Sequence, residues 1–391
     1  MIKLRFWELC IMLNISCEGS KMFKKGLLFF FFLGNIVFGG LQERVEQLEK
    51  EMKEVGAQNA MGNFGLSLTS AQPSGEELCW YVTGDVLYWD AKLGGTDYVF
   101  STGEGQNLPN PPIRGKVRSN SFGWELGGRV GIGRIISHDR WDAFLNFTYY
   151  QNHDGDSCFK YPPAFLVSQA GFFGGAFEKA KSIFDLTYMN LDFELGRKFF
   201  MSRLLTIRPH IGLKGTRMRQ EQKVKYDFSS LELEGNVIGE YYRVYNRCDF
   251  DGIGPRIGVQ GALFIGHGFQ LEGEFSGALL YCYFDGVEKE KTSPNASPVN
   301  ADIRLKGKMK RFVPFSHLFL GMSWSDYFHK EKYYISFKLG YEVLYYWREN
   351  QSISPFNWEF TNATQSTRLN FEKMAEDISF YGITFKLRLD F

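Results

Sequence analysis

From Trp80 onward the chain alternates apolar and polar side chains with a period of two residues. Leu205, Ile207 and Ile211 fall on one face of residues 205–214, whereas Arg208 and His210 fall on the other. Only a strand sorts residues in this way, because successive side chains of a strand point to opposite faces. The pattern recurs in ten segments, at 80–89, 124–132, 141–149, 189–195, 205–214, 253–263, 269–279, 318–324, 333–345 and 381–391.

The connections between these segments alternate between short and long. Short ones lie at 135–140, 200–203, 265–268 and 325–332, and long ones at 91–117, 151–182, 218–250, 284–312 and 347–376. This order is expected of a transmembrane β-barrel, since its periplasmic turns are short and its external loops are long. We therefore expect an all-β chain that forms an antiparallel transmembrane β-barrel of about 10 strands over residues 79–391. Further alternation at 241–245 and 303–310 leaves open an alternative of 12–14 strands.

Composition agrees with a barrel and excludes two other classes. Aromatic residues make up 17% of the 391 residues, and 42 are glycine. A mean hydropathy of −0.25 disfavours a polytopic helical membrane protein, and a net charge of +1 disfavours a nucleic-acid partner. Aromatic residues collect near strand ends, where we expect interface girdles; the pairs and triplets are Tyr88 with Trp89, Tyr149 with Tyr150, and Tyr345 with Tyr346 and Trp347.

The N-terminal region predicts export rather than a membrane-spanning helix. The apolar run from Leu27 to Phe38 follows two lysines and is shorter than the roughly 20 residues that a spanning helix needs. This order is typical of a secretory signal peptide within residues 1–39. Met22 is its natural start, which would make residues 1–21 an over-extended reading frame.

Residues 40–56 predict a short amphipathic coiled-coil helix, and residues 57–78 a linker. Leu41, Val45, Leu48, Met52 and Val55 recur at alternating spacings of 4 and 3 residues. Two heptads are too short to be stable alone. Either this seam joins chains in a homo-oligomer, or the helix rests on the mouth of the barrel.

Several segments resemble the Legionella-type major outer membrane protein family. They include FGWELGGRVGIG at 122–133, LDFELGRKFFMSRLLTIRPHIGLKG at 191–215 and GIGPRIGVQGALFIGHGF at 252–269. The resemblance covers roughly residues 80–391 and implies a pore-forming, porin-like barrel in the outer membrane of a Gram-negative bacterium. The terminal Phe391 also resembles the signal by which the barrel-assembly machinery recognises such chains.

Charged residues opposite the apolar stripes predict the lining of a lumen. Seven acids and seven bases fall there, which argues against strong selection by charge sign. We expect a porin-like channel for passive diffusion of small hydrophilic solutes or ions. With ten strands the pore is narrow, or these side chains pair across the interior and fill it. The expected lining residues are Glu125, Arg129, Asp142, Asp192, Glu194, Arg208, His210, Lys214, Arg256, Glu272, Glu274, Lys338, Glu342, Lys386 and Arg388.

An alternative is a structural barrel or adhesin with little or no conductance. In that case the polar external loops, such as 351–369 and 291–300, would bind host cells. Outer-membrane lipid would be a partner in either case.

We expect neither an enzyme, a cofactor nor a metal site. The six histidines are scattered, and no HExxH, GxSxG or GxxxxGK[ST] pattern occurs. Cys79, Cys158, Cys248 and Cys282 follow the signal region, and an oxidising compartment permits disulfides. We expect a disulfide among Cys158, Cys248 and Cys282 rather than one with Cys79, and the family resemblance also allows cross-links between chains.

Overall fold

The computed structural model describes the barrel region of the chain in segments. These are residues 80–102, 115–136, 141–161, 164–169, 176–202, 204–227, 232–233, 236–237, 241–293, 302–328, 333–351, 353–360, 367–373 and 375–391. The predicted signal peptide, the coiled-coil helix with its self-association seam, the linker and Cys79 lie outside these residues. No helix in the described segments has the length and apolarity to cross a bilayer.

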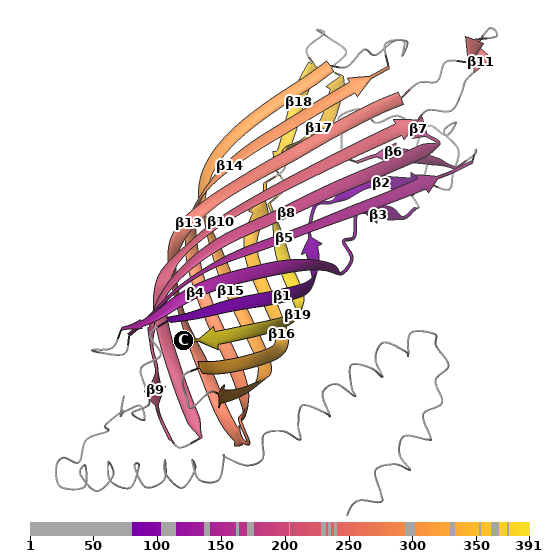
Figure 1. The fold of residues 1–391 in the computed structure, drawn as a ribbon. Coiled ribbons are helices and arrows are strands. Elements are labelled where there is room, and N and C mark those ends of the chain that lie inside the picture. The colour runs from indigo at the N-terminus through magenta and orange to yellow at the C-terminus, as the bar shows by residue number, and fades with distance from the viewer. Residues whose placement is uncertain are drawn as a thin grey trace, which may run out of the picture. The chain divides into compact units, whose positions relative to one another are not determined.

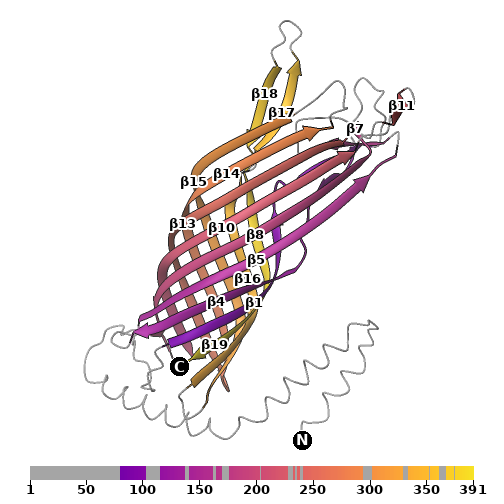
Figure 2. The same ribbon diagram turned by 45° about the horizontal axis from the view of Figure 1, so that its top comes forward.

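Ten strands of the described segments close into one antiparallel barrel (Figures 1 and 2). They are β1 (Trp80–Leu93), β4 (Glu125–Ile136), β5 (Trp141–Phe159), β8 (Lys179–Arg197), β10 (Leu205–Asp227), β13 (Tyr241–Gly266), β14 (Phe269–Thr292), β15 (Asp302–Phe328), β16 (Tyr333–Asn350) and β19 (Glu376–Asp390). The prediction of ten strands is confirmed. The alternative of 12–14 strands is wrong, because residues 241–245 and 303–310 continue β13 and β15 instead of forming further barrel strands.

The barrel closes where its last strand pairs with its first. Tyr81 lies opposite Asp390 at one end of this pairing, and Leu93 lies opposite Ile378 at the other. The backbone of Phe391 adds two hydrogen bonds to Trp80, of 2.8 and 3.1 Å. Where all ten strands pair, closure leaves no unpaired sheet edge, which is the condition for a sheet to cross hydrocarbon.

The two faces of the barrel wall have the chemistry that the alternation predicted. Outward side chains are apolar and exposed, such as Leu126 at 66% and Ile257 at 67%, whereas the inward Arg208 is 6% exposed. The outward apolar residues form a belt around the barrel, as expected for a surface that meets lipid.

Six strands, β5, β8, β10, β13, β14 and β15, continue far beyond this belt, on one side of the barrel (Figure 1). On β10 the outward positions change from Leu213 to Arg217 and Lys223, while the inward positions change from Lys214 to the buried Val224. Where the strand leaves the belt, its outward face therefore changes from apolar to charged, and its inward face changes from charged to apolar. We call this part the extension; it comprises 151–159, 179–187, 217–227, 241–251, 283–292 and 302–310.

The extension corrects the predicted lengths of three external loops. Most of 151–182, 218–250 and 284–312 is strand. The sequence pattern ended each strand where the outward apolar residues stop, although the alternation itself continues with the opposite sign.

A small sheet packs against the inner face of the extension. It contains β2 (Asp97–Thr102), β3 (Val117–Ser119), β6 (Phe165–Ser168) and β7 (Ala176–Phe177). Tyr98 and Leu166 of this sheet share one buried cluster with Val224 and Tyr226 of β10, and the Tyr226 hydroxyl donates to the Tyr98 carbonyl. The remaining short strands are β9 (Phe199–Phe200), β11 (Glu232–Leu233), β12 (Asn236–Val237), β17 (Ile353–Phe360) and β18 (Thr367–Lys373).

Only part of the predicted aromatic girdle faces outward. Tyr88 is 44% exposed and Trp347 is 40% exposed. Trp89, Tyr150 and Tyr346 instead point into the barrel with no exposed surface. The prediction was wrong for these three because adjacent residues of a strand point to opposite faces.

Candidate functional site

Inward polar side chains meet inside the barrel at the level of the belt. We call this set the lumenal network. Its members are Asp85, Arg129, Asp142, Asp192, Glu194, Arg208, Lys214, Arg256, Glu274, His317 and Glu342.

Arg256 of β13 joins three carboxylates at the centre of the network. Its Nη1 lies 2.9 Å from Glu194 Oε1 and 3.1 Å from Asp192 Oδ2, and its Nη2 lies 3.0 Å from Glu274 Oε1. The Arg256 side chain is only 4% exposed. A guanidinium suits this position because its fixed fork of donors can serve several carboxylates at once.

From Glu194 the network runs toward the end of the barrel with short turns. Arg208 Nη1 lies 3.3 Å from Glu194, and Arg208 Nη2 lies 2.8 Å from Asp142 Oδ2. The Tyr81 hydroxyl donates to Asp142 Oδ1 at 2.5 Å. This branch connects β8, β10 and β5 to β1.

From Glu274 a second branch crosses toward β4. His317 Nδ1 lies 3.4 Å from Glu274, and His317 Nε2 lies 2.9 Å from Glu342 Oε1, with its ring N–H out of line for a hydrogen bond. Arg129 binds Glu342 at 2.8 Å and Asp85 at 3.3 Å. Thr384 of β19 donates to Glu342 Oε2 at 2.6 Å. With this contact, each of the ten barrel strands holds a group that belongs to or touches the network.

The network fills the lumen at its level. Glu342 and Lys214 are each 1% exposed, and Glu194 is 3% exposed. A passage wide enough for water would expose these polar groups. The interior is therefore packed here, as expected for a barrel near the smallest size.

A layer of aromatic side chains lies next to the network. Its members, each at most 1% exposed, are Trp89, Tyr150, Tyr188, Tyr346 and Phe380. Trp89 Nε1 donates to Thr384 Oγ1 at 3.1 Å, and the hydroxyls of Tyr188 and Tyr346 lie 3.0 Å apart. The layer and the network together form two adjacent packed levels.

Most of the predicted lining residues are brought together. Nine belong to the network, and Glu272 pairs with Lys338 next to it. Lys386 and Arg388 also face inward, over the rings of Phe144 and Tyr81. Glu125 is separate, because it is the first residue of β4 and is exposed.

Three contributors were missed by the sequence prediction. Asp85 falls on the inward side of the segment 80–89, and that position could have identified it. Thr384 is uncharged, so a search for charges passes over it. His317 lies one residue before Leu318, where the predicted segment began.

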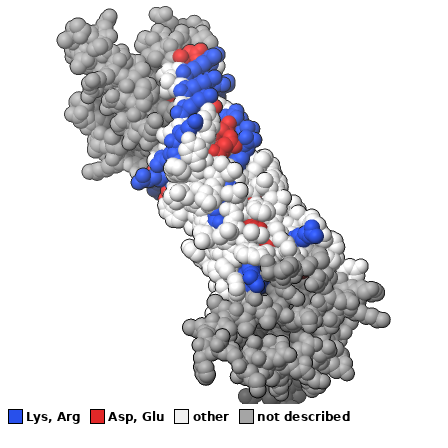
Figure 3. Space-filling model, turned by 90° about the vertical axis from the view of Figure 1, so that its left-hand side faces the viewer, with Lys and Arg blue, Asp and Glu red and all other residues white. Residues whose placement is uncertain are grey.

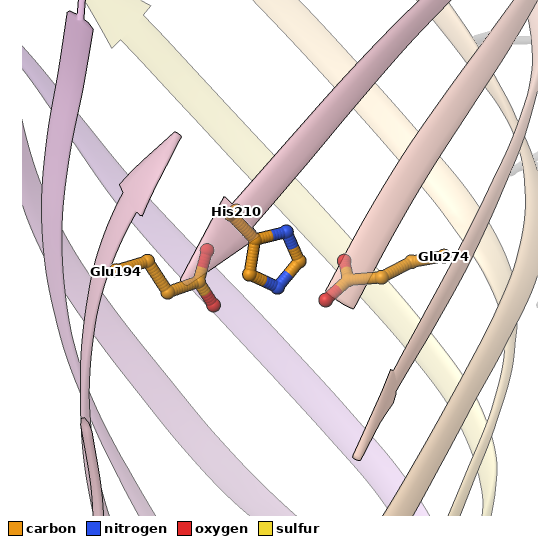
Figure 4. A group of neighbouring side chains, drawn as sticks. All are labelled: Glu194, His210 and Glu274. Carbon is orange, nitrogen blue, oxygen red and sulfur yellow. The ribbon is translucent and has the colours of Figure 1, made fainter. Parts of the chain in front are cut away.

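His210 lies between the carboxylates of Glu194 and Glu274 (Figure 4). Ligand atoms of these three residues fall within 4.8 Å of one another, a spacing that a metal ion could bridge. His210 is 2% exposed, and neither ring nitrogen has a hydrogen-bond partner among the described residues. Since Arg256 already binds both carboxylates, its guanidinium supplies the positive charge that a metal would otherwise bring.

A serine, a histidine and a glutamate lie in contact within the network. Ser276 Oγ is 3.3 Å from His317 Nδ1, and His317 in turn lies beside Glu342. Arg256 donates to the same hydroxyl from Nε and Nη2, at 3.1 and 2.9 Å. Ser276 has no exposed surface. The hydroxyl lone pairs thus face a cation in a packed interior, which is unfavourable for a nucleophile.

The predicted disulfide among three cysteines is absent from the structure. Cys158, Cys248 and Cys282 are buried free thiols. On the paired strands β13 and β14, Cys248 lies opposite Gly286 and Cys282 lies opposite Gly252, so the two cysteines are four residues out of register. That offset is about 13 Å along a strand, far beyond the reach of a disulfide.

Phe391 has an exposed side chain. Its ring is 54% exposed beside the closing pair of strands. The structure thus leaves it accessible at the end where the short turns lie.

Comparison with known proteins gives one family and several distant barrels. Residues 73–391 match the family model described as Legionella pneumophila major outer membrane protein precursor. No curated protein matches the chain.

Among solved structures, the chain is similar to the Pseudomonas putida toluene transporter TodX, at 10% identity, a TM-score of 0.28 and coverage of 83% of this chain and 91% of TodX. It is also similar to the translocator domain of the autotransporter NalP from Neisseria meningitidis, at 9% identity, a TM-score of 0.28 and coverage of 90% and 98%. Similarity at this level supports no functional argument.

Proposed function

The chain belongs to the Legionella pneumophila major outer membrane protein family, and on this premise we propose that it is a narrow channel for small ions and hydrophilic solutes, held closed by its lumenal network. As a member of that family it is an outer-membrane β-barrel of a Gram-negative type. The proposal concerns what crosses the lumen.

One observation carries the proposal: ion pairs and hydrogen bonds join all ten strands across the lumen at one level. When water enters, hydration of the separated charges offsets much of the lost pairing. The adjacent aromatic layer and the apolar side chains packed with it, such as Leu87, Leu280 and Val313, offer no such compensation. Opening therefore needs both levels to rearrange, and the charged level is the one that a single substitution can weaken.

The charges assigned to the lumen favour weak selectivity. Of the seven acids and seven bases assigned to the lining, nine pair within the network and two, Glu272 and Lys338, pair beside it. Strong selection usually requires rings of one sign. We expect both small cations and small anions to pass when the network opens.

Removing the central cation should weaken the charged level and widen the lumen there. Arg256→Ala leaves Asp192, Glu194 and Glu274 short of a shared partner, so water should enter to solvate them. In planar bilayers we expect conductance steps at least about threefold larger than those of the wild type, with a preference for cations. Conductance in the presence of neutral sugars of increasing size should measure the width of the narrow lumen.

The matched control is Arg134→Ala, which removes an exposed arginine that lies over the Trp80 ring. Its conductance should equal that of the wild type. Arg256→Lys keeps the positive charge, so its conductance should stay near that of the wild type. That outcome would attribute the effect of Arg256→Ala to loss of the charge and not to altered folding. Equal steps for Arg256→Ala and the wild type, or a wild type that passes large sugars, would contradict the proposal.

A second candidate function follows from the extension. A barrel that presents an extended wall of strands on one side can serve as a scaffold for surface interactions, with no transport. If no variant conducts while each is correctly folded, this function stands instead. We propose neither catalysis nor a cofactor, in keeping with the buried and cation-bound Ser276.

A further inference from the structure

Cations collect on the outward face of β14 and β15, where these strands form the extension. We call this set the cationic ladder: Lys289, Lys291, Arg304, Lys306, Lys308 and Lys310. The acids at outward positions of the same stretches are Asp285 and Asp302. Figure 3 shows a face of the molecule on which lysine and arginine gather in a stripe next to a largely uncharged surface.

The ladder places like charges side by side. Lys289 lies directly opposite Arg304 in the paired strands. Lys306, Lys308 and Lys310 follow one another on the same face of β15, about 7 Å apart. Like charges in these positions destabilise a sheet, so an anion bound across the two strands would relieve a built-in repulsion.

Neighbouring acids compensate this charge only in part. Arg304 pairs with Asp302 at 3.3 Å. Among the described residues, Lys306 and Lys310 have no carboxylate within ion-pair distance. The positive row also continues sideways, since Arg243 of β13 lies opposite Lys291 on one side and Lys225 of β10 on the other.

The ladder begins where the apolar belt ends. Lys310 is followed at the next outward position by Phe312, which is 61% exposed, and Lys310 lies opposite Tyr283. The short turns, the start of β1 and the end of β19 all lie at the opposite end of the barrel. The ladder is therefore on the external side. It therefore lies at the depth of the lipid head groups in the outer leaflet.

An apolar hollow lies in the belt below the ladder. Its volume is about 650 Å³, and its lining includes Ile211, Pro255, Ile257 and Leu279. Gly277 contributes no side chain there, and the pairing of β13 with β14 is interrupted at Gly254 and Pro255. The hollow thus offers room on the lipid-facing side of the wall for a hydrocarbon chain.

We infer that the cationic ladder binds the phosphate groups of an outer-leaflet glycolipid, the bisphosphorylated lipid A anchor of lipopolysaccharide. Cations bind phosphate through charge-assisted hydrogen bonds, and several along one column match a lipid with more than one phosphate. The hollow accepts an acyl chain of the same molecule. The site lies outside the lumen and is independent of conductance.

A triple variant tests the inference. Lys306→Gln, Lys308→Gln and Lys310→Gln together remove half of the ladder, and the control Lys116→Gln, Lys160→Gln and Lys179→Gln removes three lysines elsewhere. Purified protein in neutral detergent is titrated with bisphosphorylated lipid A, with dephosphorylated lipid A, with phosphatidylglycerol and with inorganic phosphate. Heat-modifiable migration in gels verifies the folded barrel.

We expect the ladder variant to bind bisphosphorylated lipid A at least tenfold more weakly than the wild type, and the control to bind equally well. Binding should weaken with salt and with loss of the phosphates. Equal binding by the ladder variant would overturn the inference. So would equal affinity for phosphatidylglycerol, for dephosphorylated lipid A or for inorganic phosphate, since each would show a different ligand.

Discussion

Gly212 lies on the inner face of β10, where this strand passes very close to β8. A Cβ at Gly212 would lie 1.9 Å from the backbone oxygen of Phe193, which cannot move without breaking the strand pairing. At Gly215 on the same strand, a Cβ would have its nearest contact at 3.7 Å, with the oxygen of Leu191. The two positions therefore make a matched pair.

We expect Gly212→Ala to lower the free energy of unfolding by about 3 kcal/mol or to prevent barrel formation, because the new methyl group overlaps backbone. Gly215→Ala should change it by less than about 1 kcal/mol. Urea unfolding in detergent micelles measures both. Equal effects of the two substitutions would show that the close approach of β8 and β10 is absent in solution.

For single residues, the sequence predicted which face of the strand a side chain occupies but not which other side chains it contacts. Strict alternation assigned Arg208, Glu194 and Arg256 to the inner face, and they do lie there. It could not show that Arg256 would join three acids, because strand register and tilt decide which inward residues meet. Trp89 was assigned to the outward girdle although the alternation places it on the inward face, and the alternation was right.

Glu288 is a buried acid of the extension, on the inward side of β14. It is 1% exposed, and neither carboxylate oxygen has a hydrogen-bond partner among the described residues. Burial, together with the nearby Glu290, raises the pKa of Glu288 from 4.5 to about 9. Glu349 resembles it, since burial raises its pKa to about 8 although Gln220 donates to it.

A raised pKa makes the extension less stable as pH rises. The unfolded chain releases the Glu288 proton near pH 4.5, but the folded chain holds it until about pH 9, so stability is full below pH 4.5 and declines above it. We expect protease resistance of the extension to fall from pH 5 to pH 8. Glu288→Gln should weaken this dependence and leave the part that is due to Glu349, whereas Asp285→Asn, on the outward side of β14, should preserve it. An unchanged pH profile in Glu288→Gln would exclude the assigned cause.

The extension also shows where element prediction stops. The sequence identified every barrel strand but ended β10 near Lys214, whereas the strand continues to Asp227. Beyond the belt, water surrounds the outer face and the small sheet covers the inner one, so apolar residues change sides. A pattern that assigns apolar residues to a single face cannot follow a strand through that change.

The whole barrel depends on the closing pair of β1 and β19, beside which Phe391 lies. Its backbone holds Trp80, but its ring is exposed. We expect Phe391→Ser to reduce the amount of barrel assembled in cells by at least about fivefold, if the ring is read during assembly, with refolding in detergent unchanged because little apolar area is buried.

Trp80→Ser serves as the control, since Trp80 is 42% exposed on the partner strand. It should leave the assembled amount near that of the wild type. Should Phe391→Ser weaken the refolded barrel as much as the cellular yield, the residue would be structural and no recognition signal would be needed.

At this largest scale, the strand count followed from the ten alternating segments, and the barrel from the order of short and long connections. The small strand number also predicted a lumen that is narrow or filled. The one-sided extension did not follow, because it depends on three-dimensional neighbours that no local pattern encodes.

The charged outer face of the extension also constrains how the chain reaches its place. With the extension on the external side, as we infer, and the polypeptide delivered from the periplasm, every lysine and arginine beyond the belt must traverse the bilayer before the wall is complete. Each such charge costs about 2–4 kcal/mol at the midplane, and the six cations of the ladder alone make unaided passage through hydrocarbon prohibitive. These hairpins must therefore be translocated through a hydrated opening before β1 pairs with β19 and closes the barrel.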